Sequence, residues 1–373
     1  MSKAPSALVL SDVHVLPKTI PNYHIVESLR QMLTLDRLSR VDALFITGDF
    51  WDRLINSVEM LSEYEEAIDI VAEILETCKA AKTVLRVLKG TPYHDWDQSK
   101  VFVRLNEIAE IGADVRYFDD VHLEKDPTLG VWIGYIPDAI RPEPQQVYDE
   151  LVEMMKTLGC EKIDYILAHG FFDFQNTYGS PAYDTVAFSE IVRYGIFCGH
   201  DHGFKQHLKV TVPGSFERLT HGDEGPKGIL ESRVIHGVHH VTFIENKNAA
   251  WLFTKDLTTV NDEVLLQRVE EAIKGHCPER EGYLGKLRLF IRSDTEHRPV
   301  LARYEKRVPF KLEISYVSED EEQEELTEAQ AAFTENLVPL TANNIDELLL
   351  EGLDVNTDIA NRILSRVKRE VKV

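Results

Sequence analysis

Short apolar runs rich in β-branched residues alternate with longer helical stretches from residue 7 to about residue 245. The runs that we expect to be strands cover residues 7–10, 43–47, 83–88, 131–135, 165–168, 195–198 and 238–244. Apolar residues at helical spacing lie before the second run and before the third, namely Ile25, Leu29, Met32 and Leu33, and then Ile68, Val71, Ile74 and Leu75. This alternation predicts a layered α/β fold with β-sheet in the middle.

A second pattern begins near residue 250. It predicts a helix at about 261–274, a shorter helical stretch around 300–306, and two strands of alternating apolar residues at 287–291 and 310–316. We therefore expect a large domain over residues 1–249 and a small α+β module over residues 250–317.

The remaining residues divide into two segments. Residues 318–340 open on the acidic run SEDEEQEE and are typical of a solvated linker. Residues 341–373 form a predicted helical tail with two apolar faces, made by Ile345, Leu348 and Leu349, and by Ile359, Ile363, Leu364, Val367 and Val371. Such a tail either packs on the body of the protein or docks on a partner.

Composition narrows the classes of protein. The formal net charge is −22, which is unfavourable for nucleic-acid binding but does not exclude DNA, because bound divalent cations reverse the local sign and much of the acid lies after residue 317. The four cysteines are far apart and suggest neither a disulfide framework nor a zinc ribbon. Without a signal-peptide core or an apolar run of roughly 18 residues, we expect a cytoplasmic protein that does not bind membranes.

Five polar clusters directly follow predicted strands. They are Asp12-Val13-His14, Gly48-Asp49-Phe50-Trp51-Asp52, Gly90-Thr91-Pro92-Tyr93-His94-Asp95, Ala168-His169-Gly170 and Gly199-His200-Asp201-His202-Gly203. Carboxylates and imidazoles bind divalent metals, which polarise a phosphoryl group and activate water. The five clusters together predict a binuclear metal centre that cleaves phosphate esters.

Spacing indicates which residues of these clusters bind metal. Asp12 and His14 are two residues apart at a strand end, so their side chains point to the same side. The same spacing directs His200 and His202 one way, whereas Asp201 faces elsewhere. Each pair is therefore expected to meet an ion.

The other clusters supply single candidates. Asp49 offers two oxygens and can bridge two ions, His169 is a further ligand, and Asp52 is expected to orient its loop rather than bind metal. His94 lies in a polar loop, where it suits stabilisation of the transition state and protonation of a leaving alkoxide. Asp95 beside it is expected to fix its tautomer.

These residues resemble the calcineurin-like metallophosphoesterase superfamily, whose pattern is D-x-H, G-D-x-x-D, G-N-H-D/E, H and G-H-x-H. Within it, Val212-Pro213-Gly214-Ser215-Phe216-Glu217-Arg218-Leu219, followed by Gly225-Pro226-Lys227-Gly228, is similar to a segment of SbcD-type DNA repair nucleases. The resemblance implies a β-sandwich flanked by helices for residues 1–249, a capping domain for 250–317 and an ATPase-binding tail for 341–373.

The resemblance also implies a ligand set for two divalent ions, manganese first and magnesium as the alternative. One ion would be held by Asp12, His14, Asp49 and His202, and the second by Asp49, His169 and His200. His94 would assist the transition state. The family's metal-binding Asn is absent, because Thr91-Pro92-Tyr93 lies between Gly90 and His94. Thr91 or water would fill that position, so the second ion should bind less tightly.

The implied activity is 3′ to 5′ exonuclease and single-strand endonuclease action on DNA, by a homodimer in complex with an SbcC-type coiled-coil ATPase. Arg53, Lys205, Lys209 and Arg218 are candidates for contacts to phosphates. Two alternatives remain open: a stand-alone phosphodiesterase or phosphatase acting on other esters, and a scaffold that has lost the second metal.

Overall fold

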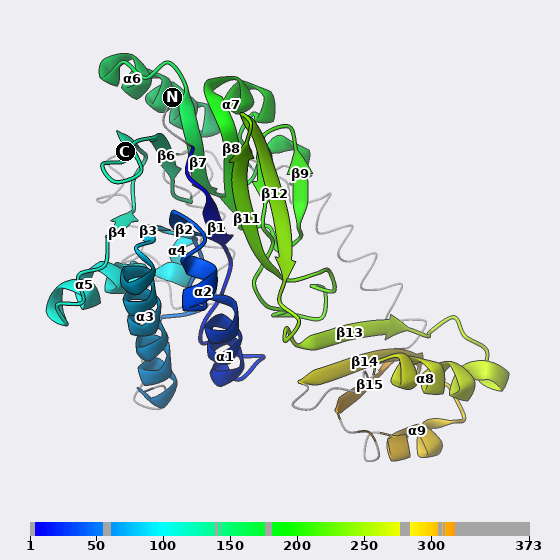
Figure 1. The fold of residues 1–373 in the computed structure, drawn as a ribbon. Coiled ribbons are helices and arrows are strands. Elements are labelled where there is room, and N and C mark those ends of the chain that lie inside the picture. The colour runs from blue at the N-terminus through cyan, green and yellow to red at the C-terminus, as the bar shows by residue number, and fades with distance from the viewer. Residues whose placement is uncertain are drawn as a thin grey trace, which may run out of the picture. The chain divides into compact units, whose positions relative to one another are not determined.

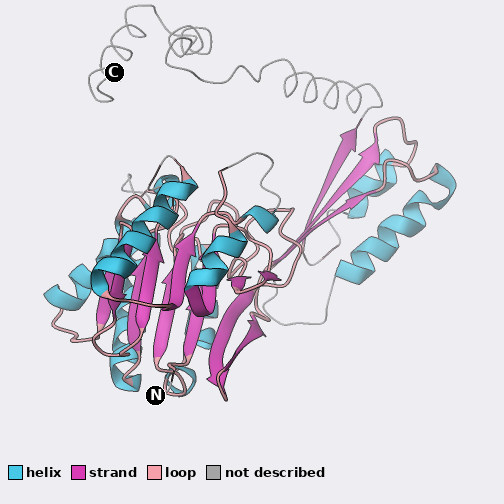
Figure 2. Cartoon of the chain, turned by 90° about the horizontal axis from the view of Figure 1, so that it is seen from above, coloured by secondary structure: helices cyan, strands magenta, loops and turns pink. Residues whose placement is uncertain are grey.

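The computed structural model describes residues 4–54, 61–138, 141, 143–175, 181–276, 284–304, 308 and 310–317. They form two six-stranded sheets, a three-stranded sheet and the helices that cover them (Figure 1 and Figure 2). Contacts divide the chain into one unit of residues 1–291 with 295–315 and a second of residues 292–294 with 316–373. The predicted linker 318–340 and helical tail 341–373 lie outside the described residues.

The first sheet has the strand order β12-β11-β1-β2-β3-β4. Four strands run parallel, namely β1 (Ala7–Leu10), β2 (Ala43–Thr47), β3 (Val84–Leu88) and β4 (Val115–Phe118). The antiparallel hairpin of β11 (Gly228–Ile235) and β12 (Val238–Glu245) joins the sheet through β1. Because β1, β2 and β3 are parallel neighbours, their carboxyl ends lie at one edge.

The second sheet has the order β5-β6-β7-β8-β10-β9. Its parallel strands are β6 (Trp132–Ile136), β7 (Ile163–His169), β8 (Val192–Gly199) and β10 (Val210–Val212). Antiparallel strands form its edges, β5 (His122–Lys125) beside β6 and β9 (Lys205–His207) beside β10. Both sheets are therefore mixed.

Helices cover the outer face of each sheet. The first sheet buries one core with α1 (Asn22–Met32), α2 (Leu35–Leu38), α3 (Leu61–Ala81) and α5 (Val101–Ile108). The second buries another with α6 (Pro144–Leu158) and α7 (Thr185–Ile191). A one-turn helix, α4 (Pro92–Asp95), and two short 3₁₀ turns, Gln98–Lys100 and Asp173–Gln175, lie in the loops. The order of layers is helix, sheet, sheet, helix.

A third core lies between the two large sheets. Side chains from both inner faces share it, among them Val9, Phe45, Tyr165 and Phe197, each no more than 1% exposed. The rings of Phe45 and Tyr165 lie 6.4 Å apart between centroids. Strands β2 and β7 are buried along their whole length because helices cover one face and the opposite sheet covers the other.

The three-stranded sheet follows, with the order β13-β14-β15. Its strands are β13 (Trp251–Asp256), β14 (Gly285–Arg292) and β15 (Lys311–Val317), and its helices are α8 (Asp262–His276) and α9 (Arg298–Tyr304). Burial alternates strictly along β14, as the sequence pattern predicts. The expected helices and strands of residues 261–316 are thus confirmed, and β13 is an additional strand.

The predicted α/β architecture is confirmed, and each of the seven apolar runs is a strand. The sequence pattern missed β4, β5, β9, β10 and β11, which are short or carry charged residues inside the strand. Such strands lack the apolar run that identifies a buried strand. In the part of the chain that the structure describes, no helix is long and apolar enough to cross a membrane.

One buried ion pair ties the first sheet to the turn between β5 and β6 of the second sheet. Arg86 on β3 is fully buried, and its Nε donates to Oδ2 of the equally buried Asp126 at 2.6 Å. Its Nη1 lies 2.9 Å from Oδ1 of Asp114. Burial disfavours the Asp126 carboxylate, but its bond to Arg86 outweighs that cost and lowers the pKa.

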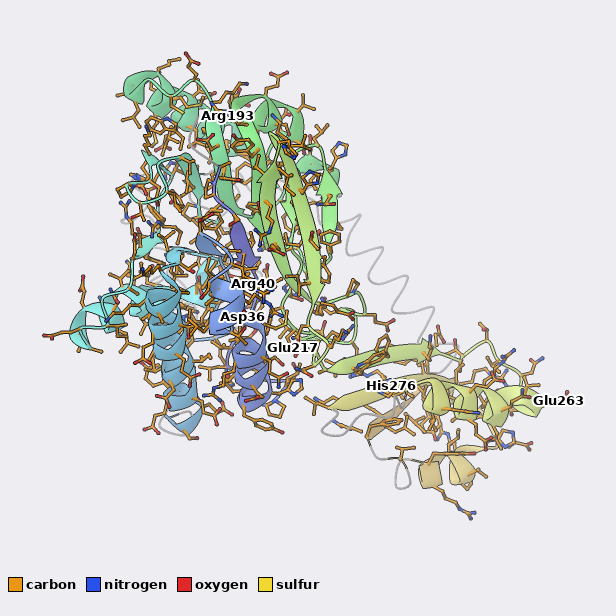
Figure 3. The ribbon with its side chains drawn as sticks, viewed as in Figure 1. Asp36, Arg40, Arg193, Glu217, Glu263 and His276 are labelled. Carbon is orange, nitrogen blue, oxygen red and sulfur yellow. The ribbon has the colours of Figure 1, made fainter. Side chains whose placement is uncertain are left out.

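We predict that Asp126→Asn lowers the free energy of unfolding by about 3 kcal/mol, because it leaves the buried Arg86 charge without its closest counterion. The exposed pair of Asp36 and Arg40, labelled in Figure 3, provides the control, and Asp36→Asn should cost under about 1 kcal/mol. Chemical denaturation measures both. The Asp126→Asn deficit should begin to shrink below about pH 4, where Asp126 of the unfolded chain protonates, and should be lost as the pH falls through the lowered pKa of the folded carboxylate. Equal stability of both variants at neutral pH would contradict the prediction.

Candidate metal centre

The five polar clusters meet at the carboxyl ends of the central strands of both large sheets. Asp12 and His14 follow β1, Asp49 follows β2, and the Gly90–Asp95 loop follows β3. From the second sheet, His169 is the last residue of β7, and His200 and His202 follow β8. Parallel strands bring their carboxyl ends to one edge, and packing of the two sheets places both edges together. The sites predicted from the sequence therefore form one cluster.

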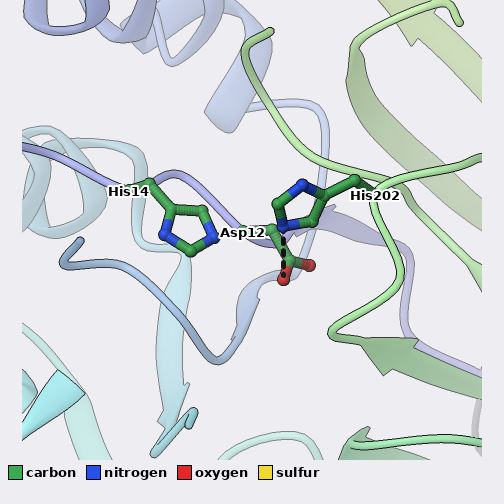
Figure 4. A group of neighbouring side chains, drawn as sticks. All are labelled: Asp12, His14 and His202. Atoms are coloured by element: carbon green, nitrogen blue, oxygen red, sulfur yellow. Dashed lines mark ion pairs between the residues drawn. The ribbon is translucent and has the colours of Figure 1, made fainter. Parts of the chain in front are cut away.

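Asp12, His14 and His202 form the first group, with ligand atoms all within 4.8 Å of one another (Figure 4). Nε2 of His202 lies 3.9 Å from Oδ1 of Asp12, and the rings of His14 and His202 are 5.2 Å apart between centroids. The Asp12 carboxylate also accepts the backbone N–H of His200 at 3.0 Å. A nitrogen and oxygen donor set of this kind fits a divalent transition metal.

Asp49, His169 and His200 form the second group, also within 4.8 Å. Nε2 of His169 lies 3.3 Å from Oδ2 of Asp49, while its Nδ1 contacts the carbonyl oxygen of Thr47 at 2.7 Å. When the ring is neutral, as metal binding requires, the latter contact keeps the proton on Nδ1 and leaves the lone pair of Nε2 directed to the centre. A carbonyl behind a metal-ligating imidazole is a common arrangement.

Thr91 occupies the place where the resemblance leads one to expect an amide ligand. Its hydroxyl oxygen lies 3.1 Å from Oδ2 of Asp49, 3.3 Å from Nε2 of His169 and 3.1 Å from Nδ1 of His200. The oxygen is thus at the middle of the second group. The backbone N–H of Thr91 donates to Oδ1 of Asp49 at 2.6 Å.

Asp49 joins the two groups. Besides its contacts in the second group, Oδ2 lies 3.9 Å from Nε2 of His14, and Asp49, His14 and His94 make a third set within 4.8 Å. One carboxylate therefore reaches histidines from both sides of the centre. This position suits the bridging role predicted for Asp49.

His14 supplies an independent sign that a ligand belongs here. It is 2% exposed, its Nδ1 lies 3.3 Å from the Asp52 carboxylate, and its Nε2 has no hydrogen-bond partner among the described residues. Leaving a buried polar atom unsatisfied costs roughly 1–3 kcal/mol. A cation between His14, Asp12 and Asp49 would remove that cost, so the residues present fit a metal.

The backbone of the ligands is unusual. Asp12, His14, Asp49 and His200 all have positive φ, at 47°, 52°, 47° and 95°. Residues other than glycine rarely adopt this region, and such strain of roughly 1–3 kcal/mol each persists where the surrounding structure enforces it. Gly90 permits the crowding, because a Cβ there would overlap the backbone nitrogen and Oδ1 of Asp49.

Charges in the cluster shift several pKa values. Burial opposes ionisation of Asp49, but His169 and then His14 stabilise the carboxylate, and its pKa is lowered. Burial likewise opposes a charge on His169, yet Asp49 raises its pKa to about 10. Desolvation and the neighbouring His169 lower the pKa of His200. The cluster holds the Asp49 carboxylate ionised and attracts positive charge, as a metal site requires.

The predicted role of Asp95 is corrected by the structure. Asp95 is fully buried and accepts hydrogen bonds from the backbone N–H of Gly90 at 2.7 Å, that of Trp51 at 3.3 Å and the hydroxyl of Ser99 at 3.0 Å. Burial, followed by repulsion from Asp49, raises its pKa to about 6. It anchors the loop, because its carboxylate is used by these donors rather than by His94.

Asp52 orients His94 instead. Its carbonyl oxygen lies 2.8 Å from Nδ1 of His94, and its carboxylate lies 3.3 Å from Nδ1 of His14. Nδ1 of His94 donates to that carbonyl, so Nε2 is left to face the centre or a substrate. The His94 side chain is 39% exposed, and its ring centroid is 4.8 Å from that of His14. His94 therefore lies between the ligands and solvent.

One of the basic residues predicted to contact phosphates is buried in the structure. Arg218 is 7% exposed, donates to the carbonyls of Ala250 and Gly225, and lies over the rings of Trp251 and Phe253. It is a structural residue, and its prediction as a substrate contact is wrong.

The other three keep contacts of their own. Lys209 donates to the carbonyl of Ser189, Lys205 pairs with Asp201 at 2.5 Å, and Arg53 pairs with Glu63 at 3.3 Å. The Asp201 carboxylate forms an ion pair with Lys205 and therefore faces away from the candidate ligands, as the sequence spacing predicts. Lys205 and Arg53 stay predictions as phosphate contacts.

Asp223 is a supporting residue that the sequence did not identify. Its Oδ2 lies 3.2 Å from Nδ1 of His202, and this contact raises the His202 pKa despite opposing desolvation. Lys227, buried nearby, donates to the carbonyl of His202 at 2.9 Å. Asp223 lies in a turn 21 residues beyond His202, so no spacing rule connects them.

No protein-family model matches this chain, and no curated protein sequence does. A solved structure described as that of TT1561 of Thermus thermophilus aligns with a TM-score of 0.40 and 10% identity, covering 64% of this chain and 99% of that chain. A second aligns with a TM-score of 0.39 and 12% identity, over 64% of this chain and 99% of the other. Likenesses at this level say nothing about the chemistry of the site.

We predict that the wild-type protein binds two manganese ions and that Asp49→Asn binds at most one, weakly, because Asp49 belongs to the second group and its carboxylate lies 3.9 Å from His14 of the first. Equilibrium dialysis with metal analysis measures the stoichiometry. Asp201→Asn is the matched control. It removes a carboxylate that lies between His200 and His202 in the sequence but pairs with Lys205, so this variant should keep both ions. Loss of one ion or more in the control, or retention of both in Asp49→Asn, would refute the bridging role.

Proposed function

We propose that this protein is a metal-dependent phosphodiesterase that acts on DNA as a nuclease. The observation that carries the proposal is the pair of ligand groups that Asp49 joins through its contact with His14, with His94 at their solvent side. When bound, two divalent ions would polarise the phosphoryl group and lower the pKa of a water molecule. The calcineurin-like identity of the sandwich and the SbcD-type family belong to the same proposal, supported by the five motifs in order.

Each residue of the cluster has a proposed role in metal binding or catalysis. Asp12, His14 and His202 hold one side of the centre, His169 and His200 hold the other, and Asp49 joins them. Asp52 and Asp223 orient His94 and His202 from behind. His94, when protonated, has its Nδ1–H on the Asp52 carbonyl and its Nε2–H available to a leaving oxygen.

DNA is the proposed substrate because of features beyond the metal motifs. In the PGSFERL segment, the backbone N–H of Phe216 donates to the carbonyl of Asp12 at 3.1 Å, and buried Glu217 accepts the N–H of Ala250 at 2.7 Å. The segment thereby links the first ligand strand to the start of the small α+β module. A small-ester phosphatase has no evident need for that module, which resembles a nuclease capping domain.

The proposed assembly is a homodimer with an SbcC-type ATPase bound to residues 341–373. That part of the chain lies outside the described residues, so the partner rests on its apolar helical pattern and on the resemblance. Removal of residues 341–373 would abolish the proposed docking and leave the metal centre intact.

The first test of function is digestion of an end-labelled DNA duplex and of a single strand by the purified protein with manganese. Stepwise shortening that is lost in Asp49→Asn and kept in Asp201→Asn is the expected result. An aryl phosphodiester serves as a second substrate. If the aryl phosphodiester is hydrolysed and both DNA substrates stay intact, also when an SbcC-type ATPase is added, the phosphodiesterase alternative is favoured. Inactivity on all three substrates would favour the scaffold.

For His94 we predict a dependence on the leaving group. His94→Asn should lower kcat on DNA about 10²-fold to 10⁴-fold, which is the usual range for a lost general acid, while manganese stoichiometry stays at two. The aryl diester, whose leaving group needs no protonation, should lose far less. His207→Asn, an exposed histidine on β9, is the matched control and should act like wild type. Equal losses on both substrates would exclude the proton-donor role.

A further inference from the structure

Two exposed aromatic residues stand beside the metal centre on the loop after β3. Tyr93 is 78% exposed and Trp96 is 50% exposed, although most large aromatic side chains of the described residues are buried or half-buried. The indole Nε1 of Trp96 donates to the carbonyl of Tyr93 at 2.8 Å, which fixes the position of one residue relative to the other. Both rings are therefore accessible to a ligand, because neither contributes to a hydrophobic core of the described residues.

The backbone keeps Trp96 in this position against its own preference. Trp96 and Asp97 have positive φ, at 43° and 65°. A bulky residue in this region is disfavoured and remains there only where other contacts enforce it. Those contacts are the buried Asp95 carboxylate on one side and the 2.6 Å ion pair of Asp97 with Lys89 on the other. Strain held in this way is typical of binding sites.

The aromatic pair lines a cavity of about 440 Å³, together with Thr91 and Asp138. Thr91 is also at the middle of the second ligand group, where its hydroxyl lies 3.1 Å from Asp49. The cavity therefore opens next to the point where a phosphate would bind. A group attached to that phosphate would enter it.

Charge indicates what kind of group that is. Lys89 is neutralised by Asp97, so the Asp138 carboxylate leaves the lining with a net negative charge. A second phosphate is disfavoured there, whereas a flat neutral ring with N–H donors is not. Nucleobases have this character, and they stack on exposed tyrosine and tryptophan rings.

We propose that Tyr93 and Trp96 form a stacking site for one nucleobase of a single strand whose phosphate lies at the metal centre. A base can reach the two rings only when it is unpaired, so the site selects single-stranded DNA or a frayed end. This assignment rests on the proposed nuclease function. Pro92 and Tyr93 make the loop between Gly90 and His94 longer than in the G-N-H-D/E pattern, and the stacking site gives this longer loop a role in substrate specificity.

The test compares a short single-stranded oligonucleotide with an otherwise identical one whose bases are all replaced by hydrogen. Tyr93→Ala and Trp96→Ala should each raise KM for the normal oligonucleotide about tenfold, within the range for loss of one stacked base, and leave kcat unchanged. Tyr93→Phe should restore the wild-type KM, since it keeps the ring. Tyr23→Ala, which removes a 62% exposed tyrosine on α1, is the control and should have no effect.

The base-free oligonucleotide separates this proposal from the proposed function. Wild type should bind it about tenfold more weakly, and Tyr93→Ala should cause no further loss. Cleavage of both oligonucleotides with equal KM by wild type and Tyr93→Ala would overturn the stacking site while the nuclease function stands. If wild type cleaves neither, fluorescence titration of binding decides: equal affinity for the two oligonucleotides overturns the stacking site, and a preference for bases that Tyr93→Ala removes supports it.

Discussion

Face-to-face packing of the two large sheets is the constraint on which the site depends. Each sheet supplies only part of the ligand set: Asp12, His14 and Asp49 come from the first, and the remaining histidines from the second. The shared core around Phe45 and Tyr165 holds the two parallel strand sets so that their carboxyl ends meet. A shift of one sheet along the other would separate the ligands without unfolding either. The apolar core therefore determines the geometry of the polar site.

Unfavourable local features are concentrated where the ligands converge. Four of the candidate ligand residues adopt left-handed backbone, Nε2 of His14 is buried without a hydrogen-bond partner among the described residues, and Gly90 lies against Asp49 so closely that no side chain fits. Each feature costs free energy in the protein alone. A bound cation offsets part of this cost by pairing with His14 and with the carboxylates, so metal binding is expected to couple to the stability of the domain. The net charge of −22 repels DNA as a whole, but two bound ions would make this edge a local point of positive charge.

The sequence by itself determined most of the apolar strands and helices and which residues gather in the candidate metal centre. Apolar runs and period-two spacing are local properties, and they correctly indicated seven strands, the orientation of Asp201 away from the ligands, and the grouping of Asp12 with His14. Charged or short strands such as β5 and β9 escaped because their pairing is set by neighbouring strands rather than by their own composition. The predicted tail has no described structure against which to compare its pattern.

Only the tertiary structure decided which neighbours the polar side chains have. Adjacency in sequence suggested that Asp95 orients His94 and that Arg218 meets phosphates, but the carboxylate of Asp95 is used by backbone donors and the guanidinium of Arg218 is buried against the β13 strand. Asp52 and Asp223 take the supporting roles through contacts that close only when the loops are folded. The physical reason is that a hydrogen bond depends on distance in space, and the chain brings distant residues together only once its sheets are packed.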